Sequence, residues 1–458
     1  MENKSAQRGL IVICTAAFLV PFMGSSLNLA LPEISNDLSM KAVTLTWMST
    51  VYLISTAIFQ IPFARLADLV GRKKVFLTGL AIYSLCCFLS GLSSSSNMLI
   101  VLRFCSGIGS AMMMGTNIAI LTALFPSEQR GKALGINSAV VYAALAAGPF
   151  LGGMLTHYFG WHSIFFASAM VGVVILVLSV FFLKGEWVES RGEKFDFVGS
   201  ILYGAGLAGV IYGFSNMPHL QGIISIIAGT VAFGFFIYFE KRQKYPVFNV
   251  RLFSGNKIFA LSSVAALINY AATSATGFML SLYLQYVRGL DARHAGLILI
   301  AQACIQSVFS LVAGGLSNRF SSSKMATAGM SIIVVGLCGL IFLSPSTPYW
   351  LIILMLMSLG VGFGIFSSPN TNVIMGSVEK KYYTQASATT GTVRLTGQAF
   401  SMGIAGMSVS FFVGNQKIIP ALHGAFLKSM QMTFTVFVIL CLIGVYASSA
   451  RIEKKKIS

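Results

Sequence analysis

Residues 64–74 read ARLADLVGRKK, a short charged segment between two long apolar runs, residues 46–64 and 75–92. Each run is close to the ~20 apolar residues that a helix needs to cross the hydrocarbon of a bilayer. Basic residues gather on the cytoplasmic side of a membrane, and four lie in this segment. The segment therefore predicts a helical hairpin whose connection lies in the cytoplasm.

Apolar runs of this length recur along the chain. Only 10% of the 458 residues are charged, against ~25% in typical globular proteins, and the mean hydropathy is +0.80. The expected fold class is an all-α membrane protein. Hydropathy and turn residues place fourteen spans, at 9–32, 46–64, 75–92, 98–124, 132–157, 161–183, 197–215, 220–239, 258–284, 294–317, 325–344, 348–376, 387–413 and 430–450.

The distribution of positive charge predicts the orientation. If the chain starts in the cytoplasm, twenty-four of the 31 Lys and Arg residues fall on inside segments and five on outside segments. The two others, Arg103 and Arg394, fall within spans. This asymmetry predicts a multi-pass protein of the cytoplasmic (inner) membrane with both termini inside. The net charge of +18 is then a basic face over anionic membrane lipids, and nucleic acid is not an expected partner.

A weak internal repeat predicts two related halves. Residues 64–68 and Lys74 match residues 314–318 and Lys324 at a constant offset of 250. Parallel six-helix repeats describe one large class of transporters. We expect a six-helix bundle at 1–183, a linker with two extra transmembrane helices at 184–257, and a second six-helix bundle at 258–458.

The sequence argues against an enzyme. No loop is long enough for a soluble catalytic domain, and no cluster of acids, histidines or nucleophiles faces one site. The seven cysteines lie in apolar stretches without metal-ligand spacing, so neither a metal nor a cofactor is expected. A membrane receptor is a further alternative, but the chain has no sizeable output domain.

Residues 64–74 resemble the cytoplasmic signature motif of the major facilitator superfamily, with Ala64 in place of its first glycine. The resemblance implies a gating latch in which Asp68, at a helix N-terminus, pairs with nearby arginines such as Arg72, while Gly71 permits a tight turn. Two more stretches are similar to superfamily motifs. Residues 102–109 carry one buried arginine, Arg103, and residues 147–153 look like the motif of the exporting, antiporter branch, with Gly148, Pro149, Gly152 and Gly153.

Further stretches are similar to the fourteen-helix drug:proton antiporter family. They are residues 28–32, 246–253, 282–285, 360–370 and 394–398, and their order is more specific than any one of them. The resemblance implies a major facilitator fold and a secondary active transporter that exports small amphiphilic, drug-like compounds by alternating access, coupled to protons. We expect it to be a monomer.

The chain departs from this family at Met23, where proton-coupled members usually carry an acid. All thirteen Asp and Glu residues map to loops, termini or helix ends. Proton coupling then needs Asp68, Glu33, Asp37 or a proton carried by the substrate. The alternative is an uncoupled facilitator or a lipid or metabolite exporter. The five histidines lie in or beside outside loops.

The candidate binding residues are polar side chains within the spans. Arg103 and Arg394 are the buried charges, so we expect neutral or anionic amphiphiles to be favoured over cations such as ethidium; the alternative is that both arginines serve folding or gating. Amides in hydrocarbon usually face protein or water, although each alone is more often a contact between helices. The cavity candidates are Asn28, Gln60, Asn117, Asn137, Tyr142, Asn269, Gln302, Gln306, Asn370, Asn372 and Gln398.

Overall fold

Long helices account for nearly all of the described chain, and no strand occurs in it. The computed structural model describes residues 2–217, 219–248, 250, 253, 255–316, 320–379 and 383–449. The first eight helices are α1 (Glu2–Asp37), α2 (Ala42–Val70), α3 (Arg72–Gly91), α4 (Ser96–Leu124), α5 (Ser127–Phe159), α6 (His162–Phe182), α7 (Phe197–Ser215) and α8 (Leu220–Glu240). The others are α10 (Lys257–Ala271), α11 (Thr276–Leu282), α12 (Ala292–Leu316), α13 (Ser322–Ile341), α14 (Tyr349–Gly376), α15 (Tyr383–Phe412) and α16 (His423–Ser449).

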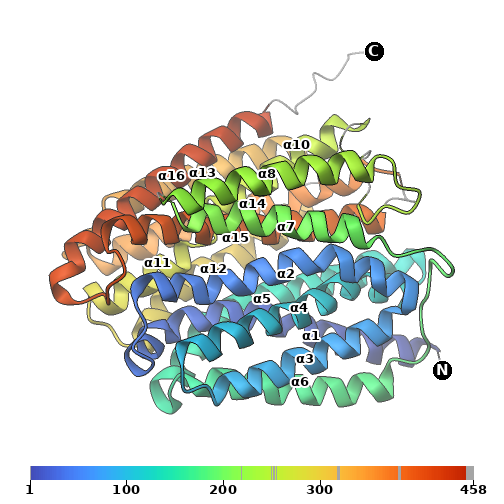
Figure 1. The fold of residues 1–458 in the computed structure, drawn as a ribbon, viewed down its shortest axis with the longest axis horizontal. Coiled ribbons are helices and arrows are strands. Elements are labelled where there is room, and N and C mark those ends of the chain that lie inside the picture. Colours follow the sequence, from blue (N-terminus) through green and yellow to red (C-terminus); the bar gives the residue numbers. More distant parts are fainter. Residues whose placement is uncertain are drawn as a thin grey trace.

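The helices run roughly side by side, so the molecule has two ends (Figure 1). We call the end at which Gly71 joins α2 to α3 the motif end, and the opposite end, at which Asp37 closes α1, the far end. Thirteen segments of the described chain are long and apolar enough to cross a membrane, and the predicted all-helical fold is confirmed. Large apolar side chains are exposed along α6 and α8, among them Phe181 and Phe235, as expected of helices that face lipid.

The long helix that does not qualify by composition is α15. It carries many Ser, Thr and Gly residues together with Arg394. Between residues 386 and 410 no described residue of α15 is exposed, because α2, α7, α10 and α16 surround it. A helix shielded from lipid can carry polar side chains, which explains its low hydropathy.

The span predicted at 258–284 is interrupted. The α10 helix ends at Ala271, α11 starts at Thr276, and a π-helical turn follows at Tyr283–Val287. The Ala275 N–H in the break donates to Ser401 Oγ of α15 at 2.9 Å. Irregular backbone at membrane depth is tolerated where protein satisfies it, and the fully buried Ala272 and Ala275 meet this condition.

The two halves repeat the same helix pairings. In the first half α1 contacts α5 and α6, α4 contacts α2 and α3, and α3 contacts α6; in the second half α10 contacts α15 and α16, α14 contacts α12 and α13, and α13 contacts α16. Two side-chain bonds repeat as well: Asn117 donates to the Ile13 carbonyl at 3.1 Å, and Asn370 donates to the Ser262 carbonyl at 3.2 Å. The structure thus carries the internal repeat that the sequence showed weakly.

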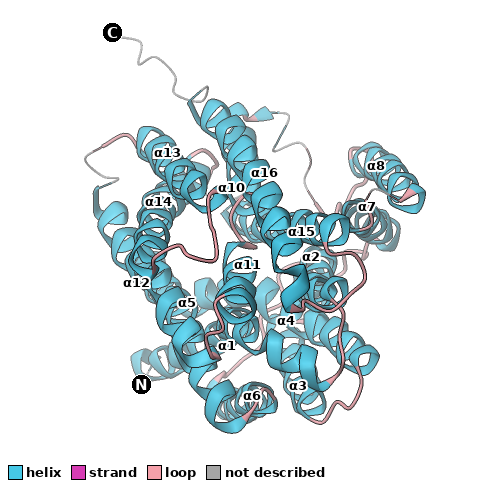
Figure 2. Cartoon of the chain, turned by 90° about the vertical axis from the view of Figure 1, so that its left-hand side faces the viewer, coloured by secondary structure: helices cyan, strands magenta, loops and turns pink. Residues whose placement is uncertain are grey.

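The halves meet along two seams, α2 against α15 and α5 against α12. In Figure 2 the α7–α8 hairpin lies at the rim beside α2 and α15, and α7 contacts both. At the far end one apolar core spans both halves, with Leu27 and Trp161 from the first and Phe278 and Phe426 from the second. The cores nearer the motif end are smaller and more local.

The contact between α3 and α4 gives a first prediction. A Cβ at Gly109 would lie 2.6 Å from the Gly79 carbonyl oxygen and 2.7 Å from the Tyr83 nitrogen, so Gly109→Ala must push the two backbones apart. We expect a loss of about 1–3 kcal/mol and a lower melting temperature in detergent. Gly135→Ala in α5 is the matched control, because its Cβ meets nothing within 4 Å. Equal melting temperatures for the two variants would contradict this packing.

Candidate functional site

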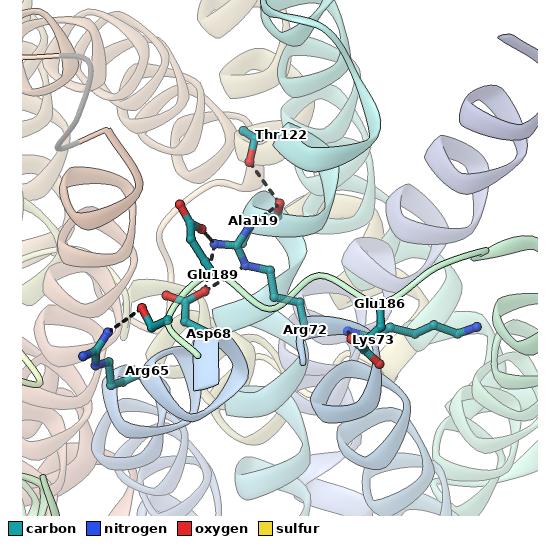
Figure 3. A network of polar contacts seen from close by, with 9 residues as sticks. Arg65, Asp68, Arg72, Lys73, Ala119, Thr122, Glu186 and Glu189 are labelled. Atoms are coloured by element: carbon teal, nitrogen blue, oxygen red, sulfur yellow. Dashed lines mark hydrogen bonds and ion pairs between the residues drawn. The ribbon is translucent and has the colours of Figure 1, made fainter. Parts of the chain in front are cut away.

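The motif loop forms a charged network at the motif end (Figure 3). Arg72 is 6% exposed, and its Nε donates to Asp68 Oδ1 at 2.8 Å. The same guanidinium pairs with Glu189 and lies 3.4 Å from the Ala119 carbonyl oxygen of α4. The expected pairing of Asp68 with Arg72 is therefore present. Asp68 lies in the last turn of α2, however, and not at a helix N-terminus, which corrects that part of the expectation.

The partners that the sequence did not reveal come from the linker before α7. We call Glu186, Glu189 and Glu193 the acidic strap. Glu189 pairs with Arg72, Glu193 pairs with Arg65, and Glu186 Oε1 accepts from the Lys73 N–H at 2.8 Å. Backbone bonds reinforce the strap, because the N–H groups of Glu189 and Ser190 donate to the Asp68 carbonyl at 3.1 and 3.0 Å. The strap holds the linker against the motif loop.

Gly71 makes this close approach possible. Its φ of 122° lies in a region that side-chain-bearing residues rarely adopt. A Cβ there would also lie 2.5 Å from the Glu186 carboxyl group. The tight turn expected at Gly71 is therefore observed, and it serves the strap as well as the turn.

Arg103 lies inside the first half. It is 2% exposed, and its guanidinium carbon lies 4.0 Å from the centre of the Tyr52 ring. Its Nε and one terminal nitrogen have no hydrogen-bond partner in the part of the chain that the structure describes. The neighbouring Tyr83 and Cys87 also belong to the first half. A cation over an aromatic ring is stabilised by the ring quadrupole, so this arginine packs α4 against α2 and α3.

Arg394 lies at the interface between the halves instead. It is half-buried on α15, near the Tyr142 hydroxyl group of α5. That hydroxyl group is 2.9 Å from Ser367 Oγ of α14, and Tyr270 of α10 is nearby. We call Tyr142, Tyr270, Ser367 and Arg394 the seam cluster. It combines a positive charge, two aromatic rings and hydroxyl groups from both halves.

The other cavity candidates fall into two groups. Asn117 and Asn370 bind helix α4 to α1 and α14 to α10 within each half, so they hold helices together. Gln60 extends across the seam toward α15, where its Nε2 is 2.7 Å from the position of a Cβ on Gly391. Of the remaining amides, Asn28 faces α11. Asn137 and Asn269 are buried and carry atoms without a partner among the described residues. The others are partly or largely exposed: Asn372 on α14, Gln302 and Gln306 on α12, and Gln398 on α15.

The exporter-type motif packs α5 against helices of both halves. Toward α1, Ser26 Oγ donates to the Gly148 carbonyl at 3.0 Å, and a Cβ at Gly152 would lie 2.5 Å from Ser26. Toward α12, the Pro149 carbonyl abuts Gly296, and a Cβ at Gly153 would lie 2.5 Å from the Ala292 carbonyl oxygen. The small residues thus permit two close helix contacts at once.

A clasp joins the halves at the far end. Asp291, just before α12, lies 2.7 Å from His294 Nδ1 and 3.5 Å from His157 Nδ1 of α5. Burial acts to raise the pKa of the Asp291 carboxyl group, but the His294 N–H, the His294 ring and the His157 ring outweigh it, and the net pKa is lowered. Arg293 adds a 3.0 Å bond to the Tyr158 hydroxyl group. This clasp was not expected from the sequence.

The far-end carboxylates that the sequence offered as proton carriers, Glu33 and Asp37, have structural partners. Glu33 Oε1 accepts from the Trp161 backbone N–H at 3.3 Å, and Asp37 Oδ2 accepts from the Trp161 ring N–H at 3.0 Å. They tie the end of α1 to the start of α6. No group of three or more His, Cys, Asp or Glu side chains that could hold a metal ion occurs among the described residues.

Asp196 and Glu240, assigned to a loop and a helix end from the sequence, are 9% and 3% exposed. The sequence gives little indication of this burial. Asp196 lies between Phe195 and Phe197, and Glu240 follows Phe239 at the end of an apolar run. Asp196 and Glu240 are the two buried acidic residues among the side chains that the structure describes, and neither forms an ion pair with another described residue.

Comparison with solved structures supports the fold. The chain aligns with a bacterial homologue of the human lysosomal transporter Spinster, in an inward-facing and unoccupied conformation, with a TM-score of 0.72 and 16% identity, over 98% of this chain and 97% of that one. A mutant of the nucleoside transporter NupG aligns with a TM-score of 0.65 and 12% identity, over 97% of this chain and 100% of that one.

Curated relatives span most of the sequence. The riboflavin transporter RibZ of Clostridioides difficile is 27% identical, over 95% of each chain. The methylenomycin A resistance protein of Bacillus subtilis is 27% identical over 89% of each chain, and the cephamycin export protein CmcT of Amycolatopsis lactamdurans is 29% identical over 88% of this chain and 85% of that one. The model of the Major Facilitator Superfamily matches residues 13–402. The chain belongs to the Major Facilitator Superfamily of membrane transporters.

Proposed function

We propose that this transporter exports small amphiphilic compounds across the cytoplasmic membrane by alternating access, coupled to protons, as in the fourteen-helix drug:proton antiporter family. The main support is the seam cluster, where both halves contribute polar side chains to one place between the two bundles. A site between repeats is where rocking halves can expose a ligand to either side. The exporter-type packing of Gly148 and Pro149 and the resistance and export proteins among the relatives favour the outward direction.

The two ends of the molecule differ in a way that suits this cycle. At the far end the shared core and the clasp at Asp291 close the seam between the halves, whereas the charged network of Arg72, Asp68 and the acidic strap at the motif end joins the first half to the linker. In our proposal the motif end is cytoplasmic and the conformation faces inward. The division into bundles at 1–183 and 258–458, with 184–257 between them, is part of the same proposal.

Arg394 sets the proposed substrate preference. It is the charged member of the seam cluster, whereas Arg103 is enclosed by Tyr52, Tyr83 and Cys87 of its own half. A positive charge in a medium of low dielectric attracts anions and repels cations. Neutral or anionic amphiphiles are therefore favoured over cations.

A second candidate function is transport of a neutral aromatic vitamin. Its support is the alignment with the riboflavin transporter RibZ over 95% of both chains. Riboflavin is planar and polar at its edges, which suits the aromatic rings and hydroxyl groups of the seam cluster. An uncoupled facilitator or a lipid or metabolite exporter stays an alternative, because Met23 stands where the resemblance to the drug:proton antiporter family implies an acid.

Substrate-triggered proton movement in proteoliposomes tests the function directly. The probes are ethidium, riboflavin and an anionic dye, with an imposed pH gradient and a pH-sensitive dye inside. We expect proton flux with the neutral or anionic probe, and less with ethidium. Probe movement without proton flux would support the uncoupled alternative, and a preference for ethidium would contradict the proposed substrate class.

Arg394→Gln should weaken transport of the anionic probe about tenfold or more, because a hydrogen bond to a charged group contributes about 1.5–3 kcal/mol. The effect on ethidium should be smaller or of opposite sign. Lys184→Gln, which removes one exposed positive charge from the linker, is the control. An equal loss for all three probes would assign Arg394 a structural role.

Asp68→Asn should slow transport strongly while leaving the protein in the membrane. The change removes a charged partner of the buried Arg72 and costs the network about 2 kcal/mol. The measurement is transport rate relative to protein abundance in membrane fractions. Glu193→Gln, on the more exposed pair with Arg65, should have a smaller effect. Full activity of a well-expressed Asp68→Asn variant would refute the latch.

Asp291→Asn should loosen the far end and increase the outward-open population. Spin labels at Phe159 and Leu297, both exposed, would report a longer distance across the seam in a background without native cysteines. Because the pKa of the Asp291 carboxyl group is lowered, its stabilisation of the closed far end is fully present above the usual Asp range near pH 4. This stabilisation is lost as the pH falls below that range. Lys428→Gln, an exposed charge outside the clasp, should leave the distance unchanged.

A further inference from the structure

Two carboxylates meet at the motif end of the α7–α8 hairpin. Asp196 directly precedes α7, and Glu240 is the last residue of α8. A Cβ on Gly199 would lie 2.5 Å from Asp196 Oδ2 and 2.8 Å from Glu240 Oε1. These two oxygens therefore lie at most 5.3 Å apart, within the range over which like charges oppose each other's ionisation.

In each carboxylate one oxygen accepts a hydrogen bond and the other does not, among the described residues. Asp196 Oδ1 accepts from the Gly199 N–H at 2.8 Å, which caps α7. Glu240 Oε1 accepts from the Val247 N–H at 3.2 Å, and the Phe248 N–H also points at this carboxylate. The second oxygen of each group, Asp196 Oδ2 and Glu240 Oε2, is buried and has no hydrogen-bond partner among the described residues. An unpaired buried acceptor is costly, and two unpaired negative charges in one place are more costly still.

The charged groups around the pair come from several elements. Arg65 on α2 supplies the opposing positive charge, Lys241 follows Glu240 in the chain, and Glu193 lies three residues before Asp196. Arg65 is already engaged, because it pairs with Glu193 and donates to Ser190 Oγ at 3.1 Å. Its Nε is buried and has no partner among the described residues. The guanidinium is thus bonded to the linker and also lies near Glu240.

We propose that Asp196 and Glu240 form a binding site for a single proton and that Arg65 competes with this proton for the pair. A protonated carboxyl group can donate to the other carboxylate, which satisfies a buried oxygen and removes one of the two charges. When Arg65 leaves Glu193, it can pair with the carboxylates, and the proton passes to water at the motif end. The site does not depend on the proposed function, but its use in coupling rests on it.

An infrared pH titration of the purified full-length protein tests the site without any substrate. Wild type should show the carbonyl band of a protonated carboxyl group at neutral pH, and the band should vanish on alkalisation. Glu240→Gln should abolish the band, because Glu240 is the more buried of the two carboxyl groups. Asp196→Asn should move the midpoint down by about one pH unit or more, because it removes the like charge. A wild type without the band, or a band unaffected by both variants, overturns the proposal.

Two further variants test whether Arg65 competes with the proton, and they should shift the midpoint of the band in opposite directions. Arg65→Gln removes the positive charge and should raise the midpoint of the band. Glu193→Gln frees Arg65 from the strap and should lower it. Glu186→Gln, on the same linker but bonded to the Lys73 N–H, should leave it unchanged. Midpoints that do not move in the Arg65 and Glu193 variants overturn the competition.

Two controls distinguish a proton-binding site from a pair of residues that only hold the hairpin together, and distinguish this proposal from the transport proposal. An amide at position 196 or 240 still accepts the backbone bonds at Gly199 and Val247, so the hairpin should keep its thermal stability to within about 1 kcal/mol. If Glu240→Gln does not fold, Asp196→Asn and the wild-type titration carry the test. Failure of every transport probe would leave the infrared result unchanged, so failure of the site and failure of the proposed function are distinguishable.

Discussion

The close contact of α5 with both α1 and α12 is the constraint on which the arrangement of the two halves depends. Ser26 bonds to the Gly148 carbonyl on one side, and the Pro149 carbonyl abuts Gly296 on the other. In a bilayer, helices do not associate by expelling water, so contact area and close backbone approach determine which surfaces pair. Larger residues here would separate the halves at the far end, where they share one apolar core.

The fold could be predicted from the sequence because its signals are local. Apolar runs and turn residues predicted the helices, and the segment ARLADLVGRKK predicted the pairing of Asp68 with Arg72 and the turn at Gly71. The break at residues 272–275 was not predictable, because it contains neither Gly nor Pro and is stabilised by Ser401 from a distant helix.

The site was predicted less well, because its contacts join segments that are remote in sequence. The glutamates of the acidic strap carry no motif, and their partners become evident only when the linker lies on the loop after α2. Similarly, Asn117 and Asn370 looked equivalent to Gln60 as polar residues in spans, yet they bond within a half while Gln60 extends across the seam. Hydropathy also placed Glu240 at a helix end without indicating that the hairpin and the segment after it would bury its carboxylate.

The position of the α7–α8 hairpin makes the two seams unequal. The hairpin covers the seam of α2 with α15, whereas exposed apolar residues such as Leu151 of α5 and Leu311 of α12 border the other seam. In the proposed rocking of the two halves, one flank would slide against protein and the other against lipid. The thickness and stiffness of the bilayer therefore act directly on the seam of α5 with α12. At the seam of α2 with α15 the α7–α8 hairpin takes the place of lipid, so this side does not depend on the lipid composition in the same way.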